Sequence, residues 1–233
     1  MKRLALMAIA LLVIGSSALA VTTCPTTTYD NYLVAGFSCV TDNLRFSSFS
    51  FSSSAQPAGI AVPASGINVT PIDQLFNEGF SFNPGMGVVT QAGGINSFQD
   101  VVVDFTVEDI NGAATIKDLG IFFNGAFTGT GSTDFAENYC LNANQVPGCP
   151  AGDAGQLHVT NPPPNFSDAV FFAPVSKVSV IKDVRASSGI NGTASISVFQ
   201  NTFSVIPEPA SIAMFGTILV GVLGLVRRKY RKS

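Results

Sequence analysis

An uncharged apolar run followed by a basic end closes this chain and limits what its last residues can fold into. Residues 212–226 carry no charge. A helix packed on a core has a polar face, and this run has none. As a helix it would span about 22 Å, short of the ~30 Å hydrocarbon slab, but long basic side chains can extend that span. The basic residues after it are Arg227, Arg228, Lys229, Arg231 and Lys232. We therefore expect a transmembrane helix over residues 210–226 and a cytoplasmic tail over residues 227–233.

The start of the chain has the layout of a secretory signal peptide. Lys2 and Arg3 provide a positive start, residues 4–14 form an apolar run, and Ala18 and Ala20 make a small-x-small cleavage site. A retained N-terminal anchor is the alternative, but the apolar run is short for one. Residues 1–20 are therefore predicted to be removed before Val21, which leaves an exported domain over residues 21–204.

Pro207, Glu208 and Pro209 stand between this domain and the apolar run. The prolines fix φ and favour an extended backbone before them, so they present Glu208 on a stiff segment. Motif, helix and basic end together resemble the PEP-CTERM sorting signal of exported bacterial proteins, here over residues 205–233. The alternative is that the prolines only interrupt the chain before a plain anchor.

The resemblance implies a partner and a route. The partner is an exosortase, a membrane-embedded processing enzyme, and the body passes through the inner membrane of a Gram-negative bacterium into the periplasm. Its destination is the cell surface or the extracellular matrix, where polysaccharide is a candidate partner. Residues 29–40, the strand holding Lys182 and Asp183, and residues 197–203 also resemble bodies that carry this tail. That second likeness implies no activity.

The predicted body is acidic and rich in small polar residues. Between Val21 and Ile206 it has five basic and fourteen acidic side chains, a net charge of −9. Nucleic-acid binding depends on neutralising phosphates with basic side chains, so this class is excluded. Serine, threonine, glycine, asparagine and valine favour strands and turns. The chain has 19 Phe and no Trp, and Phe pairs can fill a β core without hydrogen-bond partners.

Alternation of apolar and polar residues is clearest over residues 101–108. It places residues 101, 103, 105 and 107 inside, with Asp104, Thr106 and Glu108 toward solvent. Asn111-Gly112 predicts a tight hairpin into a return strand over residues 115–123, with a bulge near Asp118.

Other segments extend the β pattern. A second hairpin is expected between residues 177–186 and 193–203, and earlier strands over residues 44–51, 67–69, 79–82 and 88–90. A turn of helix is expected near residues 134–139 and a proline-rich surface loop over residues 157–168. Many short strands punctuated by Gly, Asn and Pro predict an all-β fold: a single antiparallel β-sandwich or jelly roll.

Four cysteines, Cys24, Cys39, Cys140 and Cys149, are expected to pair in an oxidising compartment. Three connectivities are open, and we favour the local one because each pair then brackets a turn-rich segment. Zinc is disfavoured, since no C-x-x-C spacing exists and His158 is the sole histidine. We expect no metal and no cofactor.

Enzymatic patterns are sparse. His158 is the only imidazole base, and no G-x-S-x-G motif occurs. Asp104 and Glu108 would lie about 13 Å apart on one strand, beyond the ~5–9.5 Å of glycosidase carboxyl pairs. Asp118 could approach them across strands, which the sequence leaves open. We expect a protein that is not an enzyme, with a hydrolase as the weakest alternative.

Binding is the stronger alternative. Asp109 and Asn111 begin a calcium-loop pattern, but Ala113 stands where the next ligand belongs. Sugar platforms use Trp or Tyr, and the body has only Tyr29, Tyr32 and Tyr139. The predicted function is a non-enzymatic exported surface or matrix protein, and the alternative is a carbohydrate- or calcium-binding module delivered by the same route.

Overall fold

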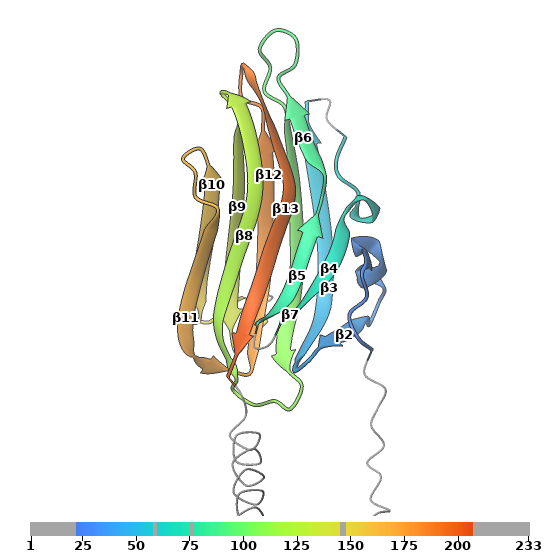
Figure 1. The fold of residues 1–233 in the computed structure, drawn as a ribbon, viewed down its shortest axis with the longest axis vertical. Coiled ribbons are helices and arrows are strands. Elements are labelled where there is room, and N and C mark those ends of the chain that lie inside the picture. The colour runs from blue at the N-terminus through green and yellow to red at the C-terminus, as the bar shows by residue number, and fades with distance from the viewer. Residues whose placement is uncertain (1–21, 58–59, 75–76, 145–147, 207–233) are drawn as a thin grey trace, which may run out of the picture.

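The structure is a computed structural model that describes residues 22–57, 60–74, 77–144 and 148–206. These residues form two antiparallel β-sheets packed face to face, with the strands running along the long axis (Figure 1). The predicted all-β sandwich is confirmed. No helix within the described ranges is long and apolar enough to cross a membrane. The helix predicted over residues 210–226 lies outside them.

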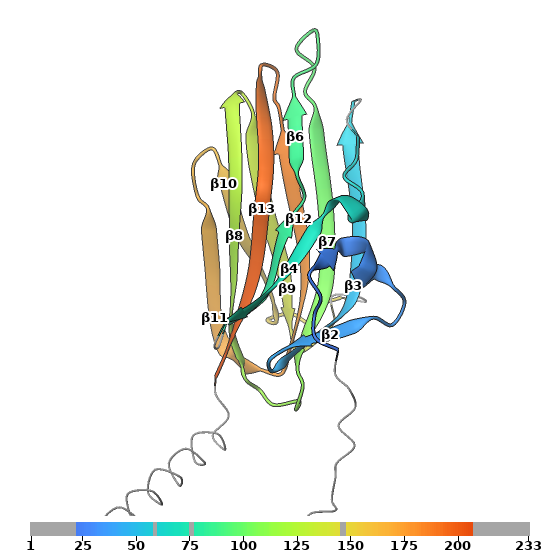
Figure 2. The same cartoon turned by 45° about the vertical axis from the view of Figure 1, so that its right-hand side comes forward.

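One sheet has seven strands, six of them in a continuous path, and β6 pairs beside them with β13. In spatial order its strands are β1 (Thr27–Thr28), β4 (Asn68–Gln74), β5 (Asn77–Asn83), β13 (Gly192–Val205), β8 (Ile116–Gly129) and β11 (Ser167–Val175), with β6 (Met86–Val89) off this path. Two 3₁₀ turns, η1 (Tyr29–Leu33) and η2 (Ala64–Gly66), lie at the β1–β4 end of this sheet (Figure 2).

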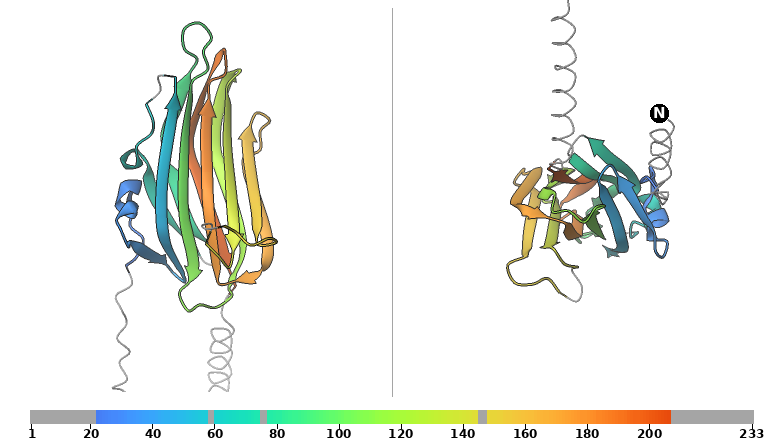
Figure 3. Two further views of the ribbon diagram at one scale, coloured as in Figure 1. Left: turned by 180° about the vertical axis from the view of Figure 1, so that it is seen from behind. Right: turned by 90° about the horizontal axis from the view of Figure 1, so that it is seen from below.

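The other sheet has six strands. In spatial order they are β10 (Ala154–Asn161), β9 (Ser132–Leu141), β12 (Lys177–Ser187), β7 (Phe98–Asp109), β3 (Leu44–Gln56) and β2 (Ser38–Thr41). Seen from behind, this sheet faces the viewer, and the view from below shows the two layers edge-on (Figure 3). β7 and β12 occupy the middle of the sheet.

The two predicted hairpins are wrong, although their strands exist. β7 lies in the six-stranded sheet and β8 in the seven-stranded sheet, and β12 and β13 are divided in the same way. Each connection therefore crosses between the layers, which lie ~10 Å apart in β-sandwiches. The turn signals mark real turns, because Gly112 and Gly189 both have positive φ. They do not say whether the chain folds back into its own sheet or into the opposite one.

The local predictions had mixed outcomes. The bulge expected near Asp118 is confirmed, because Lys117 is skipped in the pairing of β8 with β13. The helical turn over residues 134–139 is wrong, since this segment lies inside β9. The loop over residues 157–168 is also wrong for most of its length: β10 and β11 cover it except for residues 162–166. In β9 the buried polar residues Thr133 and Glu137 hid the alternation.

The core is dominated by aromatic rings from both sheets. Phe46 and Phe80 meet edge to face with centroids 4.6 Å apart, and Phe82 stacks on Phe199 at 4.7 Å. All four rings are fully buried. Phe rings thus fill the interior as the composition predicted. Tyr29 joins them and places its hydroxyl 3.1 Å from the carbonyl oxygens of Ser50 and Asp104, where β3 bulges.

One inward–outward assignment needs correction. Val101, Val103, Phe105 and Val107 are buried as predicted. Thr106, predicted to face solvent, is only 5% exposed. The segment after β9 covers the outer face near it: Asn142 N–H donates to the Lys177 carbonyl, and Ser179 Oγ to the Ala143 carbonyl, both at 2.9 Å. A single strand's alternation cannot reveal such a covering segment.

Candidate functional site

The cysteines form the two local disulfides that the sequence analysis favoured. Cys24 joins Cys39, fifteen residues on, and Cys140 joins Cys149, nine residues on. The first bridge fastens the segment before β1 to β2. The second fastens the segment after β9 back to the end of that strand. Disulfides of this kind persist in oxidising compartments outside the cytoplasm.

The residues predicted for export and sorting lie outside the described residues. They are Ala18, Ala20, Val21, Pro207, Glu208, Pro209, Arg227, Arg228, Lys229, Arg231 and Lys232. The described chain begins and ends at the same end of the sandwich (Figure 1). There Ile206 N–H donates to the Thr115 carbonyl at 2.9 Å, which ties the end of β13 to the connection between β7 and β8.

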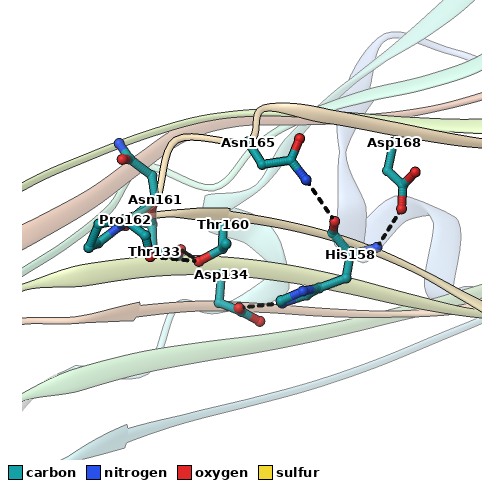
Figure 4. Close-up of polar contacts among 8 residues, drawn as sticks. All are labelled: Thr133, Asp134, His158, Thr160, Asn161, Pro162, Asn165 and Asp168. Carbon is teal, nitrogen blue, oxygen red and sulfur yellow. Dashed lines mark hydrogen bonds and ion pairs between the residues drawn. The ribbon is translucent and has the colours of Figure 1, made fainter.

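His158 lies on the outer face of β10 and pairs with a carboxylate (Figure 4). Its Nε2 is 2.6 Å from Asp134 Oδ2 on β9, and the two side chains are 50% and 43% exposed. Its main-chain N–H donates to Asp168 Oδ2 at 3.0 Å, and its carbonyl accepts from Asn165 Nδ2 at 3.2 Å.

Among the described residues, no serine or cysteine is arranged beside this His–Asp pair. The nearby hydroxyls belong to Thr133 and Thr160 (Figure 4), and both donate to main-chain carbonyls. A hydrolytic triad needs a serine or cysteine within hydrogen-bond reach of the imidazole. The geometry is that of a cross-strand contact that holds β9, β10 and the start of β11 together.

The calcium-loop fragment has a structural role in the described fold. The Asp109 carboxylate accepts hydrogen bonds from the N–H groups of Asn111 and Ala113 and from the Thr115 hydroxyl. It therefore holds the connection from β7 to β8 in shape. No group of three or more His, Cys, Asp or Glu side chains within the described ranges is placed to hold a metal ion.

Carboxylates do gather on the outer face of the six-stranded sheet. Burial, and then a hydrogen bond with Asp100, raise the pKa of Asp183 to about 6. Burial also raises the pKa of Asp104, whose Oδ2 accepts a 2.6 Å hydrogen bond from Ser50 Oγ. Asp104 and Glu108 both lie on β7, four residues apart, and they line different depressions.

A shallow depression of about 240 Å³ lies beside Asp104 on this face. Its polar wall is formed by Ser48, Ser50, Asp104, Thr106, Asn144 and Ser179. Hydroxyl, carboxylate and amide groups of this kind can hydrogen-bond a polar ligand. The depression could not be predicted from the sequence, because the segment that includes Asn144 reaches it only through tertiary structure.

A second group that the sequence analysis missed lies between the sheets. Lys182, Glu137 and Asn201 are all 0% exposed. The alternation of apolar residues along β12 indicated the position of Lys182. Residues 178, 180, 184 and 186 are apolar and buried, which places Lys182 on the inner face of β12. In the prediction from the sequence, Lys182 was counted in the net charge, and this alternation was not used.

Comparison with known proteins gives no family. No protein-family model and no curated protein matches the chain. Solved structures match it at low similarity, three of them as follows.

The carbohydrate-binding module TmCBM61, solved with β-1,4-galactotriose, has a TM-score of 0.32 and 9% identity over 65% of this chain and 86% of its own. The enzymatically active domain of tailspike protein 4 from bacteriophage CBA120 has a TM-score of 0.26 and 17% identity, over 68% of this chain and 19% of its own. The glycosylation-associated protein complex Gap123 of Streptococcus agalactiae has a TM-score of 0.26 and 11% identity, over 66% and 26%. Likeness this slight has no bearing on function.

Proposed function

We propose that this chain is an exported surface or matrix protein whose β-sandwich is a structural body and whose C-terminal segment sorts it. The observation that carries the proposal is the closure of all four cysteines into two local disulfides, with no free thiol. Such bridges form outside the cytoplasm. A signal peptide over residues 1–20 and a PEP-CTERM-like segment over residues 205–233 would supply the route.

The position of the motif supports processing by an exosortase. Pro207 comes two residues after Val205, the last residue of β13. An enzyme embedded in the membrane would therefore meet the motif next to the end of the sandwich. The prolines would keep that short segment extended, which suits an enzyme that must bind backbone. Processing there would release the body to the surface.

Fractionation of the host cell tests the sorting function. The chain is expressed with all three motif residues changed to alanine, beside a matched Ser211→Ala control. We expect the control to reach the surface fraction as the native chain does, and the motif variant to stay in the inner membrane at its full length. If all three chains were found in the same cell fractions, the C-terminal segment would be a plain membrane anchor and not a sorting signal.

A second candidate function, carbohydrate binding, is favoured by the depression beside Asp104. Its polar groups surround a volume of about 240 Å³, and acidic side chains continue along the same sheet face. Carboxylates accept hydrogen bonds from paired sugar hydroxyls. Against it, no tyrosine lines the depression and the chain has no tryptophan to stack on a sugar ring.

Binding of polysaccharide from the host's own matrix tests this second function. The exported protein and an Asp104→Ala variant are compared by retention on immobilised polysaccharide, with Asp73→Ala as a surface control. Loss of retention in Asp104→Ala alone would support the depression as the binding site. Absence of retention for the native chain would leave the structural function by itself.

A further inference from the structure

Three polar side chains meet inside the sandwich, from three strands and both sheets. Lys182 on β12 and Glu137 on β9 are direct cross-strand partners in the six-stranded sheet. Asn201 extends toward them from β13 in the seven-stranded sheet. Lys182 Nζ lies 3.2 Å from Glu137 Oε2, and Asn201 Nδ2 donates to Glu137 Oε1 at 3.0 Å. One carboxylate therefore holds the amine and the carboxamide side by side.

The surroundings of this cluster are apolar. Lys182 Nζ lies 3.8 Å from the centroid of the Phe105 ring. Phe199 and Phe203 precede and follow Asn201 on the inner face of β13, and Phe135 precedes Glu137 in the same way; all are buried. Water is thus kept from the three polar groups. Asn201 also donates to the Gly120 carbonyl at 3.3 Å, while its Oδ1 has no hydrogen-bond partner within the described ranges.

Burial shifts both ionisable groups toward their neutral forms. It lowers the pKa of Lys182 to about 8, although the charges of Glu137 and, from β7, Asp104 oppose that shift. Burial also raises the pKa of Glu137, against the opposing effects of Lys182 and Asn201. Passing one proton from Nζ to the carboxylate therefore leaves a neutral amine beside a carboxylic acid. A desolvated neutral lysine is a nucleophile, and a protonated carboxyl is a general acid.

We propose that Lys182 and Asn201 join in an intramolecular isopeptide bond, with Glu137 as the proton-transfer group. The neutral Nζ attacks Asn201 Cγ, and a bond forms between them. Glu137 takes a proton from Nζ and delivers one to Nδ2, and the Cγ–Nδ2 bond breaks with loss of ammonia. The product is a secondary amide between the two side chains. Glu137 is regenerated, and no oxidant or reductant takes part.

The fold supplies what this condensation needs. Intramolecular placement of two reacting groups replaces a large part of the entropy cost of bringing them together. The reaction also removes an ion pair from the core, where buried charges carry a desolvation penalty. The product would connect β12 to β13 across the two layers. β13 is the last strand before the C-terminal segment, so the bond would hold the body closed at the strand through which a tether would pull.

Peptide mass mapping of the full chain tests the proposal. The protein is reduced, denatured and digested with trypsin. An acylated Lys182 resists cleavage, so we expect residues 178–185 as one peptide, branched to the peptide that begins at Ala186 and contains Asn201. Its mass should be about 17 Da below the sum of the two, the mass of one ammonia. Separate unmodified peptides from the native protein would overturn the proposal.

The branched peptide also excludes another source of the same mass loss. Asparagine followed by glycine, as at Asn111 and Asn191, can lose ammonia by closing a succinimide. That product lowers the intact mass equally but joins no two peptides. A loss of ammonia without a branch would therefore count against the isopeptide bond.

Matched variants test the assigned roles. Lys182→Arg keeps the charge and the trypsin site but removes the amine, and Glu137→Gln removes the proton transfer. We expect neither to form the branched peptide. Lys177→Arg, at the partly exposed start of the same strand, should form it fully. If the core variants fail to fold, the peptide map of the native protein still shows whether the isopeptide bond forms. A branch that persisted in Glu137→Gln at the native level would overturn the role of that residue.

Discussion

Glu78 is a fully buried carboxylate that connects β5 of one sheet to the β2–β3 turn of the other. It belongs to β5, and it accepts hydrogen bonds from Thr41 Oγ1 at 2.8 Å and from Leu44 N–H at 3.2 Å, on either side of the turn between β2 and β3. Burial raises its pKa from 4.5 to about 7, because these hydrogen bonds only partly offset the lost solvation.

This raised pKa makes stability depend on pH. The folded pKa lies above the unfolded value, so the folded state holds the proton more tightly. The free energy of unfolding therefore falls as the pH rises from 4.5 to about 7. Above pH 7 the full decrease of about 3 kcal/mol is reached. Glu78→Gln should therefore raise the melting temperature at pH 8 and have little effect at pH 4. Thermal unfolding of the native chain and of Glu78→Gln at pH 4 and at pH 8 checks this prediction, and Glu108→Gln at the surface is the control. An equal effect at both would contradict the account.

The buried polar group between the sheets could not be recognised from its residue types. Lys182, Glu137 and Asn201 resemble ordinary surface residues in composition, and only the inner-face register of their strands places them in the core. For Lys182 the sequence contained that register. Its meeting with Asn201 depends on which strands of the two sheets face each other, and that is a property of the assembled sandwich.

At the scale of elements, the sequence predicted strands well and their partners poorly. Alternation identifies β7 because its inner face is apolar over residues 101–107. The pairing of strands cannot be predicted in this way, because a Gly-containing turn is compatible both with a hairpin within one sheet and with a crossing between the two sheets. The connection from β7 to β8 shows how the crossing is held: Asp109 binds the N–H groups of Asn111 and Ala113 and the hydroxyl of Thr115.

Asp109→Ala should therefore destabilise the sandwich. The change leaves the buried Thr115 hydroxyl and two partly buried N–H groups without their acceptor, which costs about 2 kcal/mol. Asp109→Asn keeps one acceptor oxygen and should lose less. Denaturant unfolding measures both, and Asp73→Ala, on an exposed edge, should stay within about 0.5 kcal/mol of the native chain. Equal stability of Asp109→Ala and the native chain would show that the connection needs no such cap.

Each disulfide closes a short loop and should stabilise the fold by a similar amount. Loops of fifteen and nine residues correspond to about 3 kcal/mol each in the chain-entropy model. Replacing both cysteines of either bridge by serine should lower the melting temperature by roughly 6–12 °C for a domain of this size. Calorimetry of the two double variants tests this. A melting temperature unaffected by both would assign the bridges no part in stability.

At the scale of the whole molecule, the parts have separate tasks. The sandwich encloses an aromatic core, and two local disulfides fasten segments to β2 and β9. The described chain starts and stops at one end of it (Figure 1). The acidic body carries a net charge of −9 over residues 21–206, which favours solubility and discourages self-association. The roles of the two chain ends are inferred from the sequence, because short motifs and apolar runs can be recognised without knowledge of tertiary contacts.

The most direct measurement is the mass of the protein recovered from the surface of its host. The account predicts a chain that begins at Val21 and ends close to Pro207, with both disulfides formed. A chain that keeps residues 227–233 and is found only in the inner membrane would contradict it.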